Sequence, residues 1–241
     1  MTDKYLTELP DASFFTKCAF VCVDLQEKEG EASVQPMHIT EYEMPSLWKQ
    51  AGFTAEDVNA ANDFAFYVCN PNAARVAEAC RTLEIPMIYI HWGARYEDMM
   101  DMDPEVRDLL IGEDPAEIER FKNLRSGRSP RSVERPASFL GVREQDYVLA
   151  KTAQDGFKST PLEFMLRNLC VENLVLIGGH TGACLGKTAK SAKLLGFRTL
   201  CVEDATNNAF ESNRIEELLK CDFDYIIQTN CFVRRVNDIS L

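Results

Sequence analysis

Short apolar runs recur along the chain in the manner of strands that are buried on both faces. Six such runs are separated by helical patterns or by irregular stretches. A continuous apolar run, rather than an alternation of apolar and polar residues, is typical of a parallel strand covered by helices on either side. We therefore predict an α/β three-layer sandwich, with a six-stranded parallel sheet and helices on both faces. The predicted strands are residues 18–24, 87–91, 147–150, 173–177, 199–202 and 225–228.

Between these runs, apolar residues recur with the spacing of helices. Asn70 is predicted to cap one helix, with Pro71 at its first position. A second helix is predicted to begin near Pro161. A third has Cys184 in its first turn and ends at Gly196, a residue type that favours a left-handed C-terminal cap.

Two long stretches, residues 27–69 and 93–145, have weak periodicity. We predict loops and short helices that cap the site in the first stretch. The second is acidic and then basic, and we expect a solvated excursion with subunit contacts, because charge runs usually face water. The alternative is that one or two arginines reach the substrate. The basic residues concerned are Arg120, Lys122, Arg125, Arg128, Arg131 and Arg135.

Length and charge limit the possible classes of protein. The 241 residues with 46% apolar content suit one well-buried core, so we predict a single domain over residues 1–241. The formal net charge of −12 argues against nucleic-acid and anionic-membrane partners, since phosphate binding depends on clustered Lys and Arg. The N-terminus lacks the pattern of a signal peptide, and no apolar stretch approaches the ~20 residues of a membrane span. We expect a cytoplasmic protein with a small-molecule or protein partner.

The cysteines point to one nucleophile. The chain has nine, scattered singly and without a CxxC pair that would suggest zinc or a redox disulfide. Cys184 differs from the rest because backbone N–H groups and the positive end of a helix dipole favour a thiolate at the start of a helix.

Three complementary groups stand at predicted strand ends: Asp24, Lys151 and, just beyond a strand, Cys184. A thiol is mostly protonated in neutral water, so it needs a base to take its proton and a cation to hold the thiolate. Asp24 is a candidate base and Lys151 a candidate cation. Together they predict a cysteine hydrolase site that does not use a histidine.

Three segments resemble the isochorismatase-like cysteine hydrolase superfamily, which includes nicotinamidases, N-carbamoylsarcosine amidohydrolase, and biuret and ureidoacrylate hydrolases. They are FVCVDLQ with Asp24, KTAQDGFKSTPLEFMLRNL with Lys151, and LVLIGGHTGACLGKTAKSAKLLGFRTLCVEDAT with Cys184. The segments come in the family's order. The resemblance implies an isochorismatase-like fold and a catalytic triad of Asp24, Lys151 and Cys184.

The resemblance also implies a cis peptide between Gly179 and His180. The backbone N–H groups of His180 and Cys184 would form an oxyanion hole, in which each donor contributes about 3 kcal/mol. The His180 side chain either lines the pocket or packs locally. A homo-oligomer, dimer or tetramer, is expected on the same ground.

Nicotinamidases of that family hold a metal with an Asp-x-His and a further His, and here His91 has no second histidine at ligand spacing. We therefore predict neither a metal nor a cofactor. Other residues at or near strand ends are candidates for substrate binding, although each alone is more often structural. They are Gln26, His91, Phe157 and Gln228.

The predicted function is metal-independent hydrolysis of a C–N bond in a small amide or ureido compound, through a thioester. One alternative is an isochorismate-type vinyl-ether hydrolase. Another is a catalytically silent binding or scaffold protein, since a fold does not fix a function. A dinucleotide-dependent oxidoreductase is disfavoured because no G-x-G-x-x-G follows the first strand.

Overall fold

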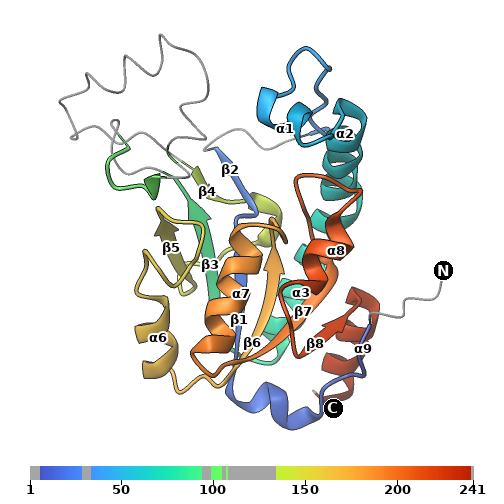
Figure 1. The fold of residues 1–241 in the computed structure, drawn as a ribbon. Helices are drawn as coiled ribbons and strands as arrows, with labels where there is room; N and C mark the ends of the chain where they lie inside the picture. Colours follow the sequence, from blue (N-terminus) through green and yellow to red (C-terminus); the bar gives the residue numbers. More distant parts are fainter. Residues whose placement is uncertain (1–5, 29–33, 94–98, 105–106, 108–133, 240–241) are drawn as a thin grey trace.

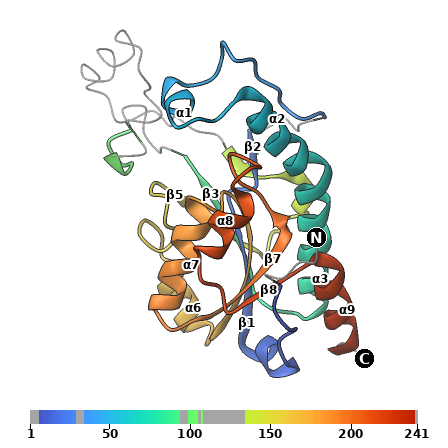
Figure 2. The same ribbon diagram turned by 45° about the vertical axis from the view of Figure 1, so that its right-hand side comes forward.

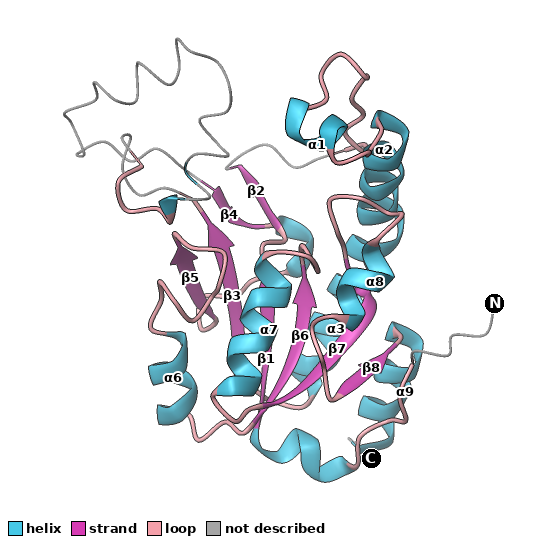
Figure 3. Cartoon of the chain, viewed as in Figure 1, coloured by secondary structure: helices cyan, strands magenta, loops and turns pink. Residues whose placement is uncertain are grey.

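The predicted six-stranded parallel sheet is confirmed. The computed structural model describes residues 6–28, 34–93, 99–104, 107 and 134–239. All neighbouring strands of the main sheet are parallel, in the order β5-β3-β1-β6-β7-β8 (Figures 1 and 3). The strands are β1 (Cys18–Val23), β3 (Met87–Trp92), β5 (Tyr147–Lys151), β6 (Asn173–Gly178), β7 (Arg198–Thr206) and β8 (Tyr225–Ile227).

Helices cover both faces of this sheet, as predicted. On one face lie α6 (Leu162–Asn168), α7 (Cys184–Leu194) and α8 (Arg214–Leu219), and on the other lie α3 (Asn70–Thr82) and α9 (Thr229–Ile239) (Figures 1 and 2). Two hydrophobic cores result, because side chains alternate between the faces of a strand. In β1, Phe20 packs on the α3 side and Val21 on the α7 side. No described helix is both long and apolar enough to cross a membrane.

Smaller elements surround the carboxyl edge and the opposite end of the sheet. A short antiparallel pair and a small cap with its own apolar cluster lie near the carboxyl edge. The cluster joins Trp48 and Phe53 to Phe210, which lies after β7. The elements are η1 (Ala12–Lys17), β2 (Gln26–Lys28), α1 (Ser46–Gln50), β4 (Glu134–Pro136) and η3 (Ser138–Leu140).

The prediction that Asn70 caps a helix is wrong. Helix α2 (Ala55–Phe64) begins after Thr54, whose side chain accepts from the Asp57 N–H, and continues through the π-helical turn η2 (Ala65–Cys69) into α3. Asn70 is helical and its N–H donates to the carbonyl of Ala65, five residues back. A proline inside a regular α-helix clashes with the carbonyl four residues earlier, and the wider π turn is what precedes Pro71 here.

A tight turn after β6 lies against the end of β1. Gly179 N–H donates to Val23 O (2.8 Å), and Asn207 N–H donates to Gly178 O (3.0 Å). Gly178 has φ of +116°, and a Cβ there would lie 2.0 Å from Val23 O. The peptide between Gly179 and His180 is cis, which confirms the prediction. This turn leads directly into α7 and Cys184.

We expect Gly178→Ala to destabilise the fold by at least about 3 kcal/mol, because both the backbone conformation and the contact with Val23 O exclude a side chain. Gly196→Ala is the matched control. Gly196 has φ of +85°, but a Cβ at this position would have no atom within 4 Å. Only the left-handed backbone conformation should then destabilise the Gly196→Ala variant, by about 1–2 kcal/mol. Urea unfolding of both variants measures the difference. Equal losses would contradict the close approach of the turn to β1.

Candidate active site

Asp24, Lys151 and Cys184 come together at the carboxyl edge of the sheet. Asp24 follows β1, Lys151 ends β5, and Cys184 begins α7 just after β6. The Lys151 Nζ lies 2.8 Å from Asp24 Oδ2 and 3.2 Å from Cys184 Sγ. Strand β3 separates β5 from β1, and the lysine spans it with its Nζ 5.9 Å from the ring centroid of Trp92 at the end of β3. The length of the Lys151 side chain suits this crossing of β3.

The Lys151 ammonium is fully buried and has a full set of acceptors. Its three N–H groups are matched by Asp24 Oδ2, Cys184 Sγ and the carbonyl of Ala153 at 3.2 Å. The Ala153 carbonyl is itself held in place, because Ser159 Oγ accepts from the N–H groups of both Thr152 and Ala153. A buried charge is tolerated when it is paired and hydrogen-bonded in this way.

Burial sets the protonation of the cluster. It raises the pKa of Asp24, and the Lys151 ammonium opposes that rise. Burial also raises the pKa of Cys184 to about 12, and the Asp24 carboxylate adds to the rise. The thiol is therefore protonated at neutral pH. Burial and the Asp24 carboxylate thus act against the thiolate that the start of a helix favours.

Two backbone N–H groups beside the thiol are available. Among the described residues, the N–H groups of His180 and Cys184 have no hydrogen-bond acceptor, whereas their neighbours in the turn do. Thr181 N–H donates to Asn207 O, and Ala183 N–H donates to His180 O. This arrangement fits the predicted oxyanion hole, whose role stays a prediction.

A pocket of about 340 Å³ opens over the cluster, a size that suits a small molecule. Its lining includes five residues that the sequence singled out: Asp24, Gln26, Lys151, His180 and Cys184. The other lining residues are Trp48, Trp92, Ala153, Gln154, Gly179, Ala183 and Ala209.

Gln26 and His180 differ in how they face this pocket. The Gln26 amide is already paired with the backbone of Trp92, since Gln26 Nε2 donates to Trp92 O (3.1 Å) and Trp92 N–H donates to Gln26 Oε1 (2.8 Å). Gln26 therefore positions Trp92. Solvent reaches the His180 side chain, and partial desolvation together with the Lys151 ammonium lowers the pKa of its imidazole. The His180 ring is neutral at pH 7.

The structure does not bring the other three substrate-binding candidates to the pocket. Phe157 stacks with Phe197 at a centroid distance of 6.0 Å and joins the core beneath α7. Gln228 donates to Glu203 Oε1 (3.2 Å). His91 is half-buried on β3, and its Nδ1 has no hydrogen-bond partner among the described residues. None of the three lines the pocket, although β3, which carries His91, lies between β1 and β5.

Six lining residues were missed by the sequence reasoning: Trp48, Trp92, Ala153, Gln154, Ala183 and Ala209. Trp92 and Gln154 follow predicted strands, so the strand-end signal that found Asp24 and Lys151 applies to them also. Trp48 and Ala209 carry no such signal, because each is placed by packing around Phe210.

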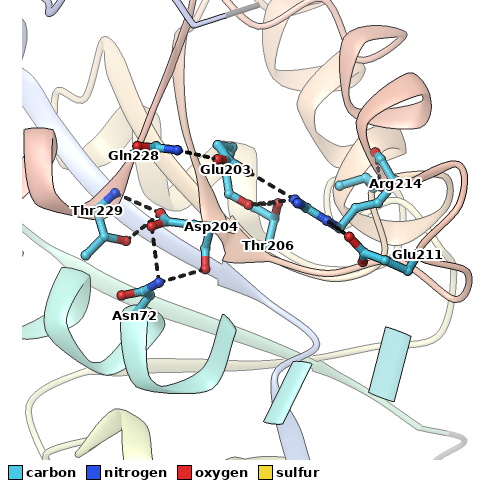
Figure 4. Close-up of polar contacts among 9 residues, drawn as sticks. Asn72, Glu203, Asp204, Thr206, Glu211, Arg214, Gln228 and Thr229 are labelled. Carbon is cyan, nitrogen blue, oxygen red and sulfur yellow. Dashed lines mark hydrogen bonds and ion pairs between the residues drawn. The ribbon is translucent and has the colours of Figure 1, made fainter. Parts of the chain in front are cut away.

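The loop that carries Ala209 lies beside a polar network at the end of β7 (Figure 4). Arg214 Nη1 lies 3.1 Å from Glu203 Oε2, and Arg214 Nε lies 3.2 Å from Glu211 Oε1. Asp204 Oδ1 accepts from both the N–H and the hydroxyl of Thr229 at 2.7 Å. The arginine ties the far end of the loop to β7, and Asp204 ties the end of β7 to α9.

Among the described residues, no group of three or more His, Cys, Asp or Glu side chains is arranged to hold a metal ion.

Several predicted charged residues fall outside the described part of the chain. The predictions for the arginine-rich stretch stay predictions. Its residues outside the described ranges are Arg120, Lys122, Arg125, Arg128 and Arg131.

Known proteins share this fold. A cysteine hydrolase from Pseudomonas syringae pv. phaseolicola superposes with a TM-score of 0.61 at 15% identity, covering 98% of this chain and 99% of its own. An N-carbamoylsarcosine amidase from Thermoplasma acidophilum gives 0.53 at 22% identity, covering 89% and 97%.

Sequence similarity to curated proteins is more local. The ureidoacrylate amidohydrolase RutB of Klebsiella pneumoniae is 36% identical over 70 residues, which is 29% of this chain and 30% of that protein. The chain thus matches less than a third of this relative's length.

The family model of the isochorismatase domain matches residues 49–220. This range contains Lys151 and Cys184. Asp24 precedes the range and contacts Lys151 through the ion pair at 2.8 Å. The matched range covers most of the chain, which therefore belongs to the isochorismatase domain family.

Proposed function

We propose that this protein hydrolyses a C–N bond of a small amide or ureide through a thioester on Cys184. The observation that carries the proposal is the buried Lys151, which holds a carboxylate and a thiol at 2.8 and 3.2 Å on the floor of a small-molecule pocket. The names of its relatives, an amidohydrolase, an amidase and a cysteine hydrolase, support the same class of reaction.

The first half-reaction follows from the protonation of the cluster. The Cys184 thiol transfers its proton to Asp24 as the sulfur attacks the substrate carbonyl, so that no free thiolate is needed beforehand. A C–S bond forms and the carbonyl oxygen becomes an oxyanion, which accepts hydrogen bonds from the N–H groups of His180 and Cys184. Asp24 returns the proton to the leaving nitrogen as the C–N bond breaks, and ammonia or an amine departs.

The second half-reaction regenerates the thiol. Asp24, again a carboxylate, removes a proton from water as the water oxygen attacks the thioester carbon. The C–S bond breaks, the proton returns to the sulfur, and a carboxylic or carbamic acid leaves. The Lys151 ammonium offsets the negative charge, which passes from Asp24 to the substrate oxygen and back in each half-reaction.

An ammonia-release screen over primary amides and ureides tests the proposal. We expect turnover of at least one compound, and Cys184→Ala should reduce it by at least about a thousandfold while the circular dichroism spectrum is unchanged. Cys170→Ala is the matched control, because Cys170 is an exposed thiol away from the pocket, and it should keep full activity. Full activity of Cys184→Ala on a confirmed substrate would rule out the thioester.

The pH profile of kcat/KM should be flat across neutral pH and fall on the acid side. Asp24 must be ionised to accept the thiol proton, and its raised pKa means that activity is lost as the pH falls through a value above the ordinary 3.8. Because the pKa of Cys184 lies at about 12, deprotonation of the resting thiol adds no transition near pH 8. Stopped assays between pH 4 and about pH 10 measure the profile. A rise in activity with an apparent pKa of about 8.5, the ordinary value of a thiol, would instead indicate a free thiolate as the attacking species.

A further inference from the structure

Gln154 offers an amide in the same pocket as the Cys184 thiol. The Gln154 side chain lines the pocket, is half-buried, and has no hydrogen-bond partner among the described residues. Gln26 lines the same pocket but has both ends of its amide engaged by Trp92. Gln154 is therefore the pocket carboxamide that remains able both to donate to a ligand and to accept from it.

The backbone on both sides of Gln154 is fixed. Ser159 Oγ accepts from the Ala153 N–H at 3.1 Å. On the other side, Asp155 Oδ2 accepts from Ser191 Oγ at 2.6 Å, and the Gly156 N–H donates to Thr188 Oγ1 at 2.9 Å. A polar group on a rigid support is suited to fixing the orientation of a ligand, because little freedom is lost when the ligand binds.

Trp48 supplies an apolar wall from a distant part of the chain. It is half-buried and meets Phe210 edge to face at 5.0 Å, within the small cluster that also contains Phe53. The remaining pocket surface comes largely from Trp92 and alanines. This surface favours a substituent without charge.

The charges of the described residues that line the pocket balance without a substrate. Of the described residues that line it, Lys151 is the permanent cation, and its ammonium is already paired with Asp24. The net charge of −12 adds a field that disfavours anions. A substrate carboxylate would find no unpaired cation among those lining residues, and burying an unpaired charge is costly.

We propose that this pocket selects an uncharged primary ureide or amide, with Gln154 hydrogen-bonded to its polar end and Trp48 packed against its apolar substituent. This inference rests on the proposed amide hydrolysis for its chemistry, yet it can be tested by binding alone. Gln154 and Trp48 are specificity-determining residues in this scheme and take no part in proton transfer.

The chain provides its own reporter, because both of its tryptophans line the pocket. The Cys184→Ala protein is titrated with two probes while its tryptophan fluorescence is measured. The probes are N-propylurea and N-carbamoyl-β-alanine, and the second differs from the first by a carboxylate in place of the terminal methyl group. We expect saturable binding of N-propylurea. N-carbamoyl-β-alanine should bind at least about tenfold more weakly, which corresponds to a binding free energy that is less favourable by about 1.4 kcal/mol. Equal or tighter binding of the carboxylate would overturn the proposal.

Two further variants, made in the same Cys184→Ala background, separate the roles of the two side chains. Gln154→Met keeps the length of the side chain and should weaken both N-propylurea and N-methylurea by about tenfold, since both lose the hydrogen bond. Trp48→Ala should weaken N-propylurea more than N-methylurea. Gln145→Met, at an exposed turn outside the pocket, is the control and should change neither. If Gln154→Met binds both ureas as the control does, Gln154 has no role in selection.

Failure of this inference is distinguishable from failure of the proposed function. Selective binding of N-propylurea without ammonia release from any compound by the wild-type protein would contradict hydrolysis and support the substrate class. Ammonia release with preference for N-carbamoyl-β-alanine would support hydrolysis and overturn the substrate class.

Discussion

The buried ammonium of Lys151 is the constraint on which the site depends. A charge without access to water must be compensated locally, and here a carboxylate, a thiol and a carbonyl provide one acceptor for each N–H group. These acceptors come from β1, from α7 and from the loop after β5, so the requirement fixes the ends of three chain segments relative to one another. The same requirement places the thiol within reach of the base that would take its proton.

Much of the fold and the centre of the site could be predicted from the sequence, because both depend on local patterns. Apolar runs identified the strands, and Asp24 and Lys151 were found because they stand where those runs end. The order of strands in the sheet is a tertiary property, however. Gln228 also follows a strand, yet β8 lies at the sheet edge beyond β7, and its amide is used by Glu203. Position at a strand end was therefore not sufficient to place a residue at the site.

The rest could not be predicted because packing decided it. Asn70-Pro71 has the local chemistry of a helix start, but the preceding residues complete a longer helix through a π turn, and the proline is accommodated within it. Trp48 lies in a weakly patterned stretch, and its place at the pocket depends on Phe210, more than 150 residues later. No periodicity within either segment encodes that contact.

The position of Cys184 at a helix start has a different consequence from the one that the sequence favoured. Backbone N–H groups stabilise negative charge wherever it forms near them. In the resting protein that charge does not sit on sulfur, since burial and Asp24 raise the pKa of the thiol to about 12. In the proposed mechanism the negative charge appears instead on the substrate oxygen, at the moment when the sulfur has lost its proton to Asp24. Donors that are not satisfied by a resting thiolate are then available to the oxyanion, and their effect falls on the transition state rather than on the ground state.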